Sequence, residues 1–250
     1  MIRIILHGCS GRMGHIISDI CKNDRETKIV AGVDVFGDAY DDYPVFRSLS
    51  DCPEADVVID FSTAAAIDDL LRFCSKKEMP VVVCTTGLSD EQTQMLRKVS
   101  EKTAVLKSAN MSVGINLLEV LIAQAAPKLA AAGFDIEIVE KHHRTKIDAP
   151  SGTAIALADA ANGALAGEYD YVYDRSGRRE KRPVKEIGIS AIRGGTIVGD
   201  HDVIFAGQDE VITLSHRAYS RAVFGKGAVE AAKFLAGKEA GFYTMSDVLK

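Results

Sequence analysis

The sequence has little that would suit a nucleic-acid surface or a membrane. Its 250 residues carry 30 Lys and Arg against 35 Asp and Glu. The resulting net charge of −5 argues against a general nucleic-acid surface. The most apolar helix that we expect, near 115–132, is interrupted by Asn116, Glu119, Gln124 and Lys128, so no apolar run approaches membrane length. We therefore expect no nucleic-acid partner and no membrane contact.

Cysteines are also few, and none stands in a C-x-x-C spacing. The five cysteines all lie in the first 84 residues: Cys9, Cys21, Cys52, Cys74 and Cys84. Their odd number and irregular spacing favour reduced thiols over a disulfide framework. Met1 leads directly into an apolar strand with no signal-peptide pattern, so we expect a cytoplasmic protein.

Strands and helices alternate through the first 110 residues. Apolar strands are expected at 2–7, 28–33, 55–61, 81–84 and 104–108. Helices are expected from the first glycine turn to about 23, then at 64–77 and 90–102. This alternation predicts an α/β fold with an N-terminal Rossmann-type, doubly wound parallel sheet.

The pattern changes after Asn110. A long helix over 114–132, which Pro127 should kink, precedes a half-buried strand at 134–140. A helix at 153–165 and a polar loop at 167–183 follow. Four strands with short turns are then expected at 186–193, 195–199, 201–206 and 210–217, which predicts an antiparallel or mixed sheet.

These elements predict three segments. Residues 1–112 would form a dinucleotide-binding domain, and residues 113–221 an inserted α+β domain with a mixed sheet. Residues 222–250 would hold a C-terminal helix that returns to the first domain. We see no internal repeat and no low-complexity tract.

A glycine turn, Gly8-Cys9-Ser10-Gly11-Arg12-Met13-Gly14, follows the first strand and opens a helix. Glycines at this spacing allow a tight turn and close approach of the backbone, and the helix N-terminus then faces a pyrophosphate. Asp34 ends the second strand, where a carboxylate can accept both ribose hydroxyls of the adenosine half. The context of strand, turn, helix, strand and acid favours a dinucleotide site over a glycine turn without a ligand.

Two further turns end later strands of the same expected sheet. They are Cys84-Thr85-Thr86-Gly87 and Ser108-Ala109-Asn110-Met111. Ligands of doubly wound sheets lie at the carboxyl ends of the strands, so these turns could contact the nicotinamide and its ribose. Taken alone, each could equally be the ordinary start of a helix.

The segment His142-His143-Arg144-Thr145-Lys146 carries the most chemistry, and Ser151-Gly152-Thr153 follows it closely. A histidine of near-neutral pKa can exchange protons, and a lysine can hold a carboxylate or give up a proton. A Ser-Gly-Thr turn at a helix start presents backbone N–H groups to an anion. Beside a dinucleotide site, this cluster predicts a nicotinamide-dependent reductase of a small acidic metabolite.

Other interpretations of these residues compete with that one. The histidines could be partly buried structural residues, or ligands of zinc, although no Cys or carboxylate trio stands nearby. The run from Arg175 to Arg182 could contact RNA, but it lacks aromatic stacking partners and is more typical of a solvated loop. A non-catalytic dinucleotide sensor would keep the glycine turn without needing the His142/Lys146 cluster. A related reductase of another acidic imine or aldehyde is a further alternative.

The stretch from Glu140 to Ala154 resembles the signature of the 4-hydroxy-tetrahydrodipicolinate (dihydrodipicolinate) reductase family, which serves the diaminopimelate route to lysine. The resemblance spans the chain in the right order. It includes Gly8–Gly14, Asp60–Ser62, Thr85–Gly87, Asn110–Asn116, Ile192–Gly195, Gly199–His201, Ser220–Arg221, Phe224 and Gly227–Ala228.

The resemblance implies a role for each candidate residue. His142 and Lys146 match the family's proton donors, and His143, Gly152 and Thr153 match its substrate contacts. The matching cofactor contacts are Gly8, Cys9, Ser10, Gly11, Arg12, Met13, Asp34, Cys84, Thr85, Thr86, Ser108, Ala109, Asn110 and Met111. The resemblance also implies a dicarboxylate substrate, NADH or NADPH as cofactor, no metal, and a homotetramer in which the sheets of the substrate domains pack together.

Two positions depart from the family pattern. Cys84 stands where a glycine is common, in the turn expected to face the nicotinamide. Val35 follows Asp34, where some members carry an arginine for the 2′-phosphate of NADPH. The second departure predicts that the chain favours, or at least accepts, NADH.

Overall fold

The computed structural model describes residues 1–36 and 41–250. The chain divides into two compact units, one made of Met1–Val113 with Arg221–Lys250 and the other of Gly114–Ser220. These boundaries differ by one residue from those expected at 112/113 and 221/222. The roles that we assigned to the segments remain predictions.

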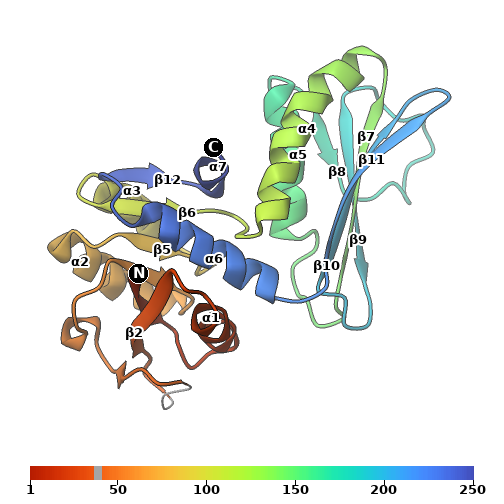
Figure 1. Ribbon diagram of the computed structural model, residues 1–250. Helices are drawn as coiled ribbons and strands as arrows, with labels where there is room; N and C mark the ends of the chain where they lie inside the picture. The colour runs from red at the N-terminus through yellow and green to blue at the C-terminus, as the bar shows by residue number, and fades with distance from the viewer. Residues whose placement is uncertain (37–40) are drawn as a thin grey trace. The chain divides into compact units, whose positions relative to one another are not determined.

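The first unit contains a seven-stranded sheet in the order β12-β6-β5-β4-β1-β2-β3, in which every neighbouring pair is parallel. Its strands are β1 (Ile2–His7), β2 (Thr27–Val33), β3 (Val45–Phe46), β4 (Val57–Asp60), β5 (Val81–Val83), β6 (Ala104–Lys107) and β12 (Gly241–Tyr243). Figure 1 labels β2, β5, β6 and β12 of this sheet. The expected Rossmann-type sheet is confirmed. The order reverses between β1 and β4, the position where doubly wound sheets bind ligands.

Helices cover both faces of this sheet. On one face α1 (Arg12–Lys22), α6 (Ala222–Leu235) and α7 (Met245–Val248) share a core with β1 and β4. On the other face α2 (Ile67–Lys77) and α3 (Asp90–Ser100) pack against β4 and β5. Two short 3₁₀ helices, η1 (Leu49–Asp51) and η2 (Ala64–Ala66), complete the unit. The apolar strands are therefore buried on both sides, as parallel sheets require.

The second unit contains a five-stranded mixed sheet in the order β11-β10-β7-β9-β8. The strands are β7 (Asp135–His142), β8 (Asp170–Val172), β9 (Glu186–Arg193), β10 (Gly199–Ala206) and β11 (Val211–Ala218). One face packs on α4 (Val113–Ala131, which starts in the first unit) and α5 (Gly152–Ala164) around a core that includes Ile136, Ile138 and Phe205. The expected mixed sheet is confirmed.

Several expected elements need correction. Residues 195–198, expected to begin a strand, form the turn between β9 and β10, where Gly195 has a φ of +49° that a strand cannot accommodate. The polar loop 167–183 contains β8, and the C-terminal segment adds β12 and α7 to the expected helix. The strand expected to end at Glu140 continues to His142, because residues 141 and 142 still pair with β9.

The membrane expectation also needs correction. Helix α4 runs through Pro127 to Ala131, and over 19 residues it is long and apolar enough to cross a membrane by length and composition alone. Its buried side, with Leu118, Ile122 and Ala126, belongs to the core of the second unit. Only 28% of its apolar stretch is buried, and its exposed apolar side chains include Leu117, Val120 and Leu121. A single helix of this length and composition is weak support for a membrane span.

Candidate active site

The glycine turn between β1 and α1 is made of closely packed backbone. Gly8 has a φ of +80°, and a Cβ on it would lie 2.5 Å from the carbonyl oxygen of Phe61. A Cβ on Gly14 would overlap the carbonyl of Cys9. Gly11 is the N-cap of α1, where no side chain caps the helix and no acidic residue stands in the first turn. The backbone N–H groups at the start of α1 have no side-chain cap, and the glycine turn lets a ligand approach them closely. This arrangement fits the pyrophosphate of a dinucleotide.

Asp34 lies directly after β2 and beside this turn. Its Oδ2 accepts a hydrogen bond from the Ser10 amide at 3.0 Å, and its Oδ1 accepts one from the Phe36 amide at 3.0 Å. The carboxylate is therefore held in a fixed orientation. It lines a cavity of about 450 Å³ together with Val35, Arg47, Arg72 and Lys76.

Arg47 was not singled out from the sequence. Its Nη1 donates to the main-chain oxygen of Asp34 at 3.1 Å, and both residues line this cavity. Arg72, in the same cavity, is paired with Asp69 at 2.7 Å. An arginine 13 residues beyond the carboxylate has no local motif, so only the fold reveals it.

The two later turns are anchored at the carboxyl ends of β5 and β6. The Cys84 amide donates to the Asp60 carbonyl at 2.9 Å, and Lys107 Nζ donates to the Thr85 carbonyl at 2.6 Å. Asn110 Oδ1 accepts from the Ser112 amide at 2.8 Å. Burial raises the pKa of the Cys84 thiol well above its ordinary value, which disfavours the thiolate that a nucleophile needs.

A buried pair, His7 and Asp60, lies at the ends of β1 and β4, where the strand order reverses. His7 Nδ1 is 2.9 Å from Asp60 Oδ1, which also accepts from the Ser62 hydroxyl at 2.5 Å. Burial opposes ionisation of Asp60, yet His7 and Ser62 hold its pKa below the ordinary value. Sequence reasoning gave His7 no role, although a histidine that ends an apolar strand before the glycine turn was a usable signal.

In the second unit, His142 is the last residue of β7 and is largely buried. Its Nδ1 lies 2.6 Å from Oε2 of Glu140, a carboxylate with no exposed surface. Burial lowers the pKa of His142, as do the charges of Lys146 and Arg193, while Glu140 raises it. Burial favours the neutral imidazole and the Glu140 carboxylate favours the imidazolium, so the two effects on the pKa oppose each other. Such a balance is expected for a group that exchanges protons.

Lys146 and His143 lie in the turn that follows β7. Lys146 Nζ forms an ion pair with Asp148 Oδ1 at 2.8 Å, and the Lys146 amide donates to the His143 carbonyl at 3.1 Å. Thr145 Oγ1 lies 2.8 Å from His143 Nδ1. The turn therefore carries the Lys146 ammonium and the His143 imidazole directly after His142, the last residue of β7.

Ser151 is the N-cap of α5, and its hydroxyl accepts from the Ala154 amide at 3.1 Å. Gly152 is exposed and has open space beside its Cα, with Thr153 next to it in the first turn. Helix α5 has no acidic residue in that turn. Burial raises the pKa of the Asp148 carboxyl, but mainly Lys146, together with the Gly152 amide, holds that pKa below its ordinary value, so the start of α5 already holds an anionic group.

Three side chains around His142 had no role in the sequence reasoning: Glu140, Arg193 and His201. The alternation of β7 places Glu140 and His142 on the same face as Ile136 and Ile138. Glu140 could have been noticed from the sequence, because it is a carboxylate at a position of the strand alternation that is otherwise apolar. Arg193 and His201 lie on β9 and β10, and only the pairing of these strands with β7 reveals their contacts.

The zinc interpretation receives no support from the part of the chain that the structure describes. No group of three or more His, Cys, Asp or Glu side chains among residues 1–36 and 41–250 could hold a metal ion. All five cysteines, which lie within these ranges, are free.

The arginine-rich loop is not solvated in the way that we expected. Arg175 forms a bidentate pair with Glu137 at 2.8 and 2.9 Å and also contacts Glu186. Arg178 pairs with the buried Glu186 at 2.6 Å, and Arg182 pairs with Asp135 at 2.7 Å. These guanidinium groups fasten the loop to the sheet because the strands present carboxylates to them.

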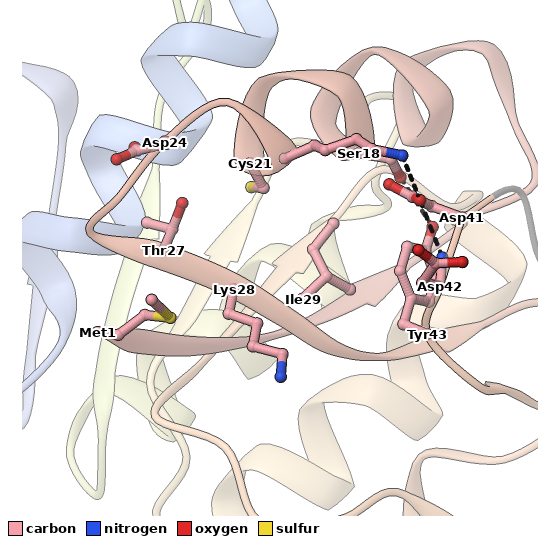
Figure 2. Close-up of a pocket in the computed structure, with 11 residues that line it drawn as sticks. Met1, Ser18, Cys21, Asp24, Thr27, Lys28, Ile29, Asp41, Asp42 and Tyr43 are labelled. Atoms are coloured by element: carbon pink, nitrogen blue, oxygen red, sulfur yellow. Dashed lines mark hydrogen bonds and ion pairs between the residues drawn. The ribbon is translucent and has the colours of Figure 1, made fainter.

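A second cavity, of about 290 Å³, lies beside α1 and β2 (Figure 2). Ser18, Cys21, Ile29 and Tyr43 are among its lining residues, and the Ser18 and Tyr43 hydroxyls are 2.8 Å apart. None of the candidate site residues lines it. It is therefore separate from the candidate site.

Comparisons with known proteins agree with this geometry. Residues 2–111 match the family model described as "Dihydrodipicolinate reductase, N-terminus", and residues 114–249 match "Dihydrodipicolinate reductase, C-terminus". A 4-hydroxy-tetrahydrodipicolinate reductase of Caldanaerobacter subterraneus subsp. tengcongensis is 53% identical over 251 residues, covering 100% of this chain and 99% of the relative. One from Clostridium tetani is 47% identical, covering 100% and 97%.

A solved structure is also similar over nearly the whole chain. It is a dipicolinate-bound dihydrodipicolinate reductase from Paenisporosarcina sp. TG-14, with a TM-score of 0.79 and 26% identity. The similarity covers 98% of this chain and 97% of that one. A diaminopimelate dehydrogenase of C. glutamicum, at 13% identity and a TM-score of 0.59, shares the fold.

Proposed function

Because the chain belongs to the dihydrodipicolinate reductase family, we propose that it reduces 4-hydroxy-tetrahydrodipicolinate, by way of dihydrodipicolinate, to tetrahydrodipicolinate. The chain is an NAD(P)-dependent oxidoreductase, and the family serves the diaminopimelate route to lysine. The observation that carries the proposal is the buried contact of His142 with Glu140, beside Lys146 and the start of α5.

The substrate of this reaction carries two carboxylates, and the second unit offers two cationic or N–H-rich positions for them. Lys146 provides one, since its ammonium can exchange Asp148 for a substrate carboxylate. We assign the other to the Gly152 and Thr153 amides at the start of α5, where the substrate carboxylate would replace Asp148 at the Gly152 amide. We assign His143, in the same turn as Lys146, to the substrate as well.

His142 and Lys146 supply the proton in this proposal. The nicotinamide, when bound, supplies the hydride that adds to the conjugated ring of the substrate. Negative charge then develops on the enamine nitrogen system, and a cationic His142 or Lys146 stabilises it and donates the proton. Burial of His142 strengthens this electrostatic effect because little water screens it.

The first unit would hold the cofactor through the residues predicted from the sequence. The uncapped start of α1 suits the pyrophosphate, and Asp34 suits the adenosine ribose. The turns at Cys84–Thr86 and Ser108–Met111 lie at the ends of β5 and β6, where a nicotinamide is expected.

We propose that both NADH and NADPH are used. Asp34 can accept the ribose hydroxyls of NADH, and no arginine follows it. We assign Arg47, whose Nη1 donates to the Asp34 main-chain oxygen, to the 2′-phosphate of NADPH. We also propose that the protein is a homotetramer and lies in the cytoplasm. Sedimentation velocity tests the tetramer by its mass.

A turnover assay tests the proposed function. The purified chain should oxidise NADH and NADPH when 4-hydroxy-tetrahydrodipicolinate is supplied freshly by its synthase. Small aldehydes and other acidic imines, offered at the same concentration, should give little or no oxidation. Turnover of an aldehyde in preference to the cyclic imine would favour the related-reductase alternative. Binding of the cofactor without any turnover would favour the sensor.

A further inference from the structure

The fully buried carboxylate of Glu140 has four hydrogen-bond donors around it. Oε1 accepts from Arg193 Nη2 at 2.7 Å and from the Ser151 amide at 2.9 Å. Oε2 accepts from Arg193 Nη1 at 2.8 Å and lies 2.6 Å from His142 Nδ1. A bidentate arginine and two further donors compensate the cost of burying this charge.

These contacts keep Glu140 ionised. Burial alone would raise its pKa, yet the hydrogen bonds from Arg193, His142 and Ser151 hold that pKa below the ordinary value. An ionised carboxylate can only accept hydrogen bonds. Nδ1 of His142 must therefore carry a proton, which leaves Nε2 as the nitrogen that gains and loses one.

The neighbouring strand leaves room for Nε2. Gly199 on β10 lies beside His142, and a Cβ on Gly199 would sit 3.0 Å from Nε2. Arg193 on β9 pairs in register with His142 on the other side. The ring is thus held at Nδ1, and Nε2 lies beside Gly199, where a larger residue would crowd it.

Glu140 also connects His142 to the helix that faces the substrate in our proposal. The Ser151 amide that it holds belongs to the N-cap of α5, and Ser151 Oγ lies 3.2 Å from His201 Nε2. Arg193 Nη2 further donates to the Asp148 carbonyl at 2.6 Å, which fixes the segment that leads to α5. One carboxylate therefore orders the proton-exchanging ring and the anion-binding helix start together.

We propose that Glu140 is the positioning residue of this site, which fixes His142 with Nε2 as the reactive nitrogen and sets its distance from the start of α5. The proposal rests on the role of His142 in the proposed function. The charged and titratable groups around the ring are Glu140 on β7, Arg193 on β9, His201 on β10, and Lys146 with its partner Asp148 after β7.

The first test measures the tautomer of His142 directly. Ring ¹⁵N NMR of the whole enzyme, with the His142 signal assigned by its loss in His142→Gln, should show a protonated Nδ1 in the neutral ring. In Glu140→Gln the pH midpoint of this signal should move to lower pH, because the anion that favours the imidazolium is gone. A neutral ring protonated at Nε2, or an unchanged midpoint, would overturn the proposal whatever the activity.

The second test measures activity. Glu140→Gln should lower kcat by about 10–100-fold, a loss of the size seen when the carboxylate that orients a metal-ligating histidine is removed. The limb of the kcat profile that falls as pH rises should move to lower pH, while the Kd of NADH stays unchanged. Glu140→Asp, which restores the charge, should return the limb towards its wild-type position. If Glu140→Gln does not fold, the tautomer of His142 in the wild-type enzyme decides the proposal.

A matched control separates this role from a merely structural one. Glu186 is another buried carboxylate in the same sheet, paired with Arg175 and Arg178. Glu186→Gln should change stability but leave the pH profile and the His142 signal in place. Equal changes in the two Gln variants would overturn the proposal. If His142→Gln retained full activity, the proposed function of His142 would fail instead, and the NMR test of Glu140 would still decide the positioning role.

Discussion

Among single residues, Lys146 offers a test of how the substrate carboxylate is bound. Its ammonium is paired with Asp148 and would hold a substrate carboxylate. A charge-assisted contact of this kind contributes about 1.5–3 kcal/mol. Lys146→Ala should therefore raise the substrate KM by about one to two decades. It should also lower kcat if Lys146 supplies the proton.

Fluorescence titration supplies the control for Lys146. The Kd of NADH should be nearly the same in Lys146→Ala and the wild type, because the proposed cofactor residues belong to Met1–Val113. A variant that loses NADH binding while it keeps its substrate KM would contradict the assignment of Lys146 to the substrate.

Substitutions of Asp34 and Arg47 should change the preference between NADH and NADPH in opposite directions. Asp34→Ala should weaken NADH more than NADPH, because it removes the acceptor for the ribose hydroxyls. Arg47→Ala should weaken NADPH by about one to two decades and NADH little, since only NADPH offers a phosphate to the guanidinium. Kd values for both cofactors with both variants check this. Parallel losses for NADH and NADPH in both variants would show that neither residue discriminates.

The same residues show how far a sequence can be interpreted. His142, Lys146 and the Ser-Gly-Thr start of α5 lie close together in sequence, so local spacing alone predicts their cluster. Arg193 reaches Glu140 across 53 positions because β9 pairs in parallel with β7. That register depends on long-range packing, which one sequence without the fold does not reveal.

Among the elements, the start of α5 can be compared with the start of α3, because a serine caps each helix. Ser151 caps α5, and Ser89 caps α3 with a reciprocal capping box to Gln92. Loss of either cap by substitution with Ala should lower the free energy of unfolding by about 1 kcal/mol. Only Ser151→Ala should also raise the substrate KM, because only α5 faces the substrate in our proposal.

Urea unfolding and steady-state kinetics on both variants measure the two effects separately. A rise in KM for Ser89→Ala equal to that for Ser151→Ala would mean that general destabilisation, and not the α5 start, controls substrate binding.

The elements themselves were predictable where the apolar pattern was strong. Strands β1, β2, β5 and β6 lie close to their expected bounds because each is an apolar run buried on both faces. Strands β8 and β12 have only three residues each and are half exposed, so no hydrophobic periodicity distinguishes them from loops. The turn at 195–198 contains apolar Ile197 and Val198, which resemble a strand, but the backbone of Gly195 reverses the chain.

At the scale of the whole molecule, buried histidines give stability a pH dependence. Burial lowers the pKa of His201 from 6.5 to about 4, so the unfolded chain takes up a proton first as the pH falls. The contribution of His201 to the free energy of unfolding is present above pH 6.5 and declines as the pH falls from 6.5 towards 4. His201 alone should cost about 1 kcal/mol of unfolding free energy between pH 6.5 and 5.5.

Urea unfolding at pH 7.5, 6.5 and 5.5 measures this decline, with His201→Asn as the comparison. The variant should show a smaller decline by about 1 kcal/mol. His142 and His216, whose pKa values burial also lowers, act in the same direction and leave a residual slope. An identical slope in the variant would show that His201 does not remain neutral in the folded chain.

The turnover of His142→Gln tests most directly whether His142 donates the proton. With freshly formed 4-hydroxy-tetrahydrodipicolinate and saturating NADH, kcat should fall by about 10²–10⁴-fold, the usual contribution of a general acid. The Kd of NADH should remain at its wild-type value. A variant with near-native kcat would contradict the proton-donating role of His142 and leave it a structural residue of β7.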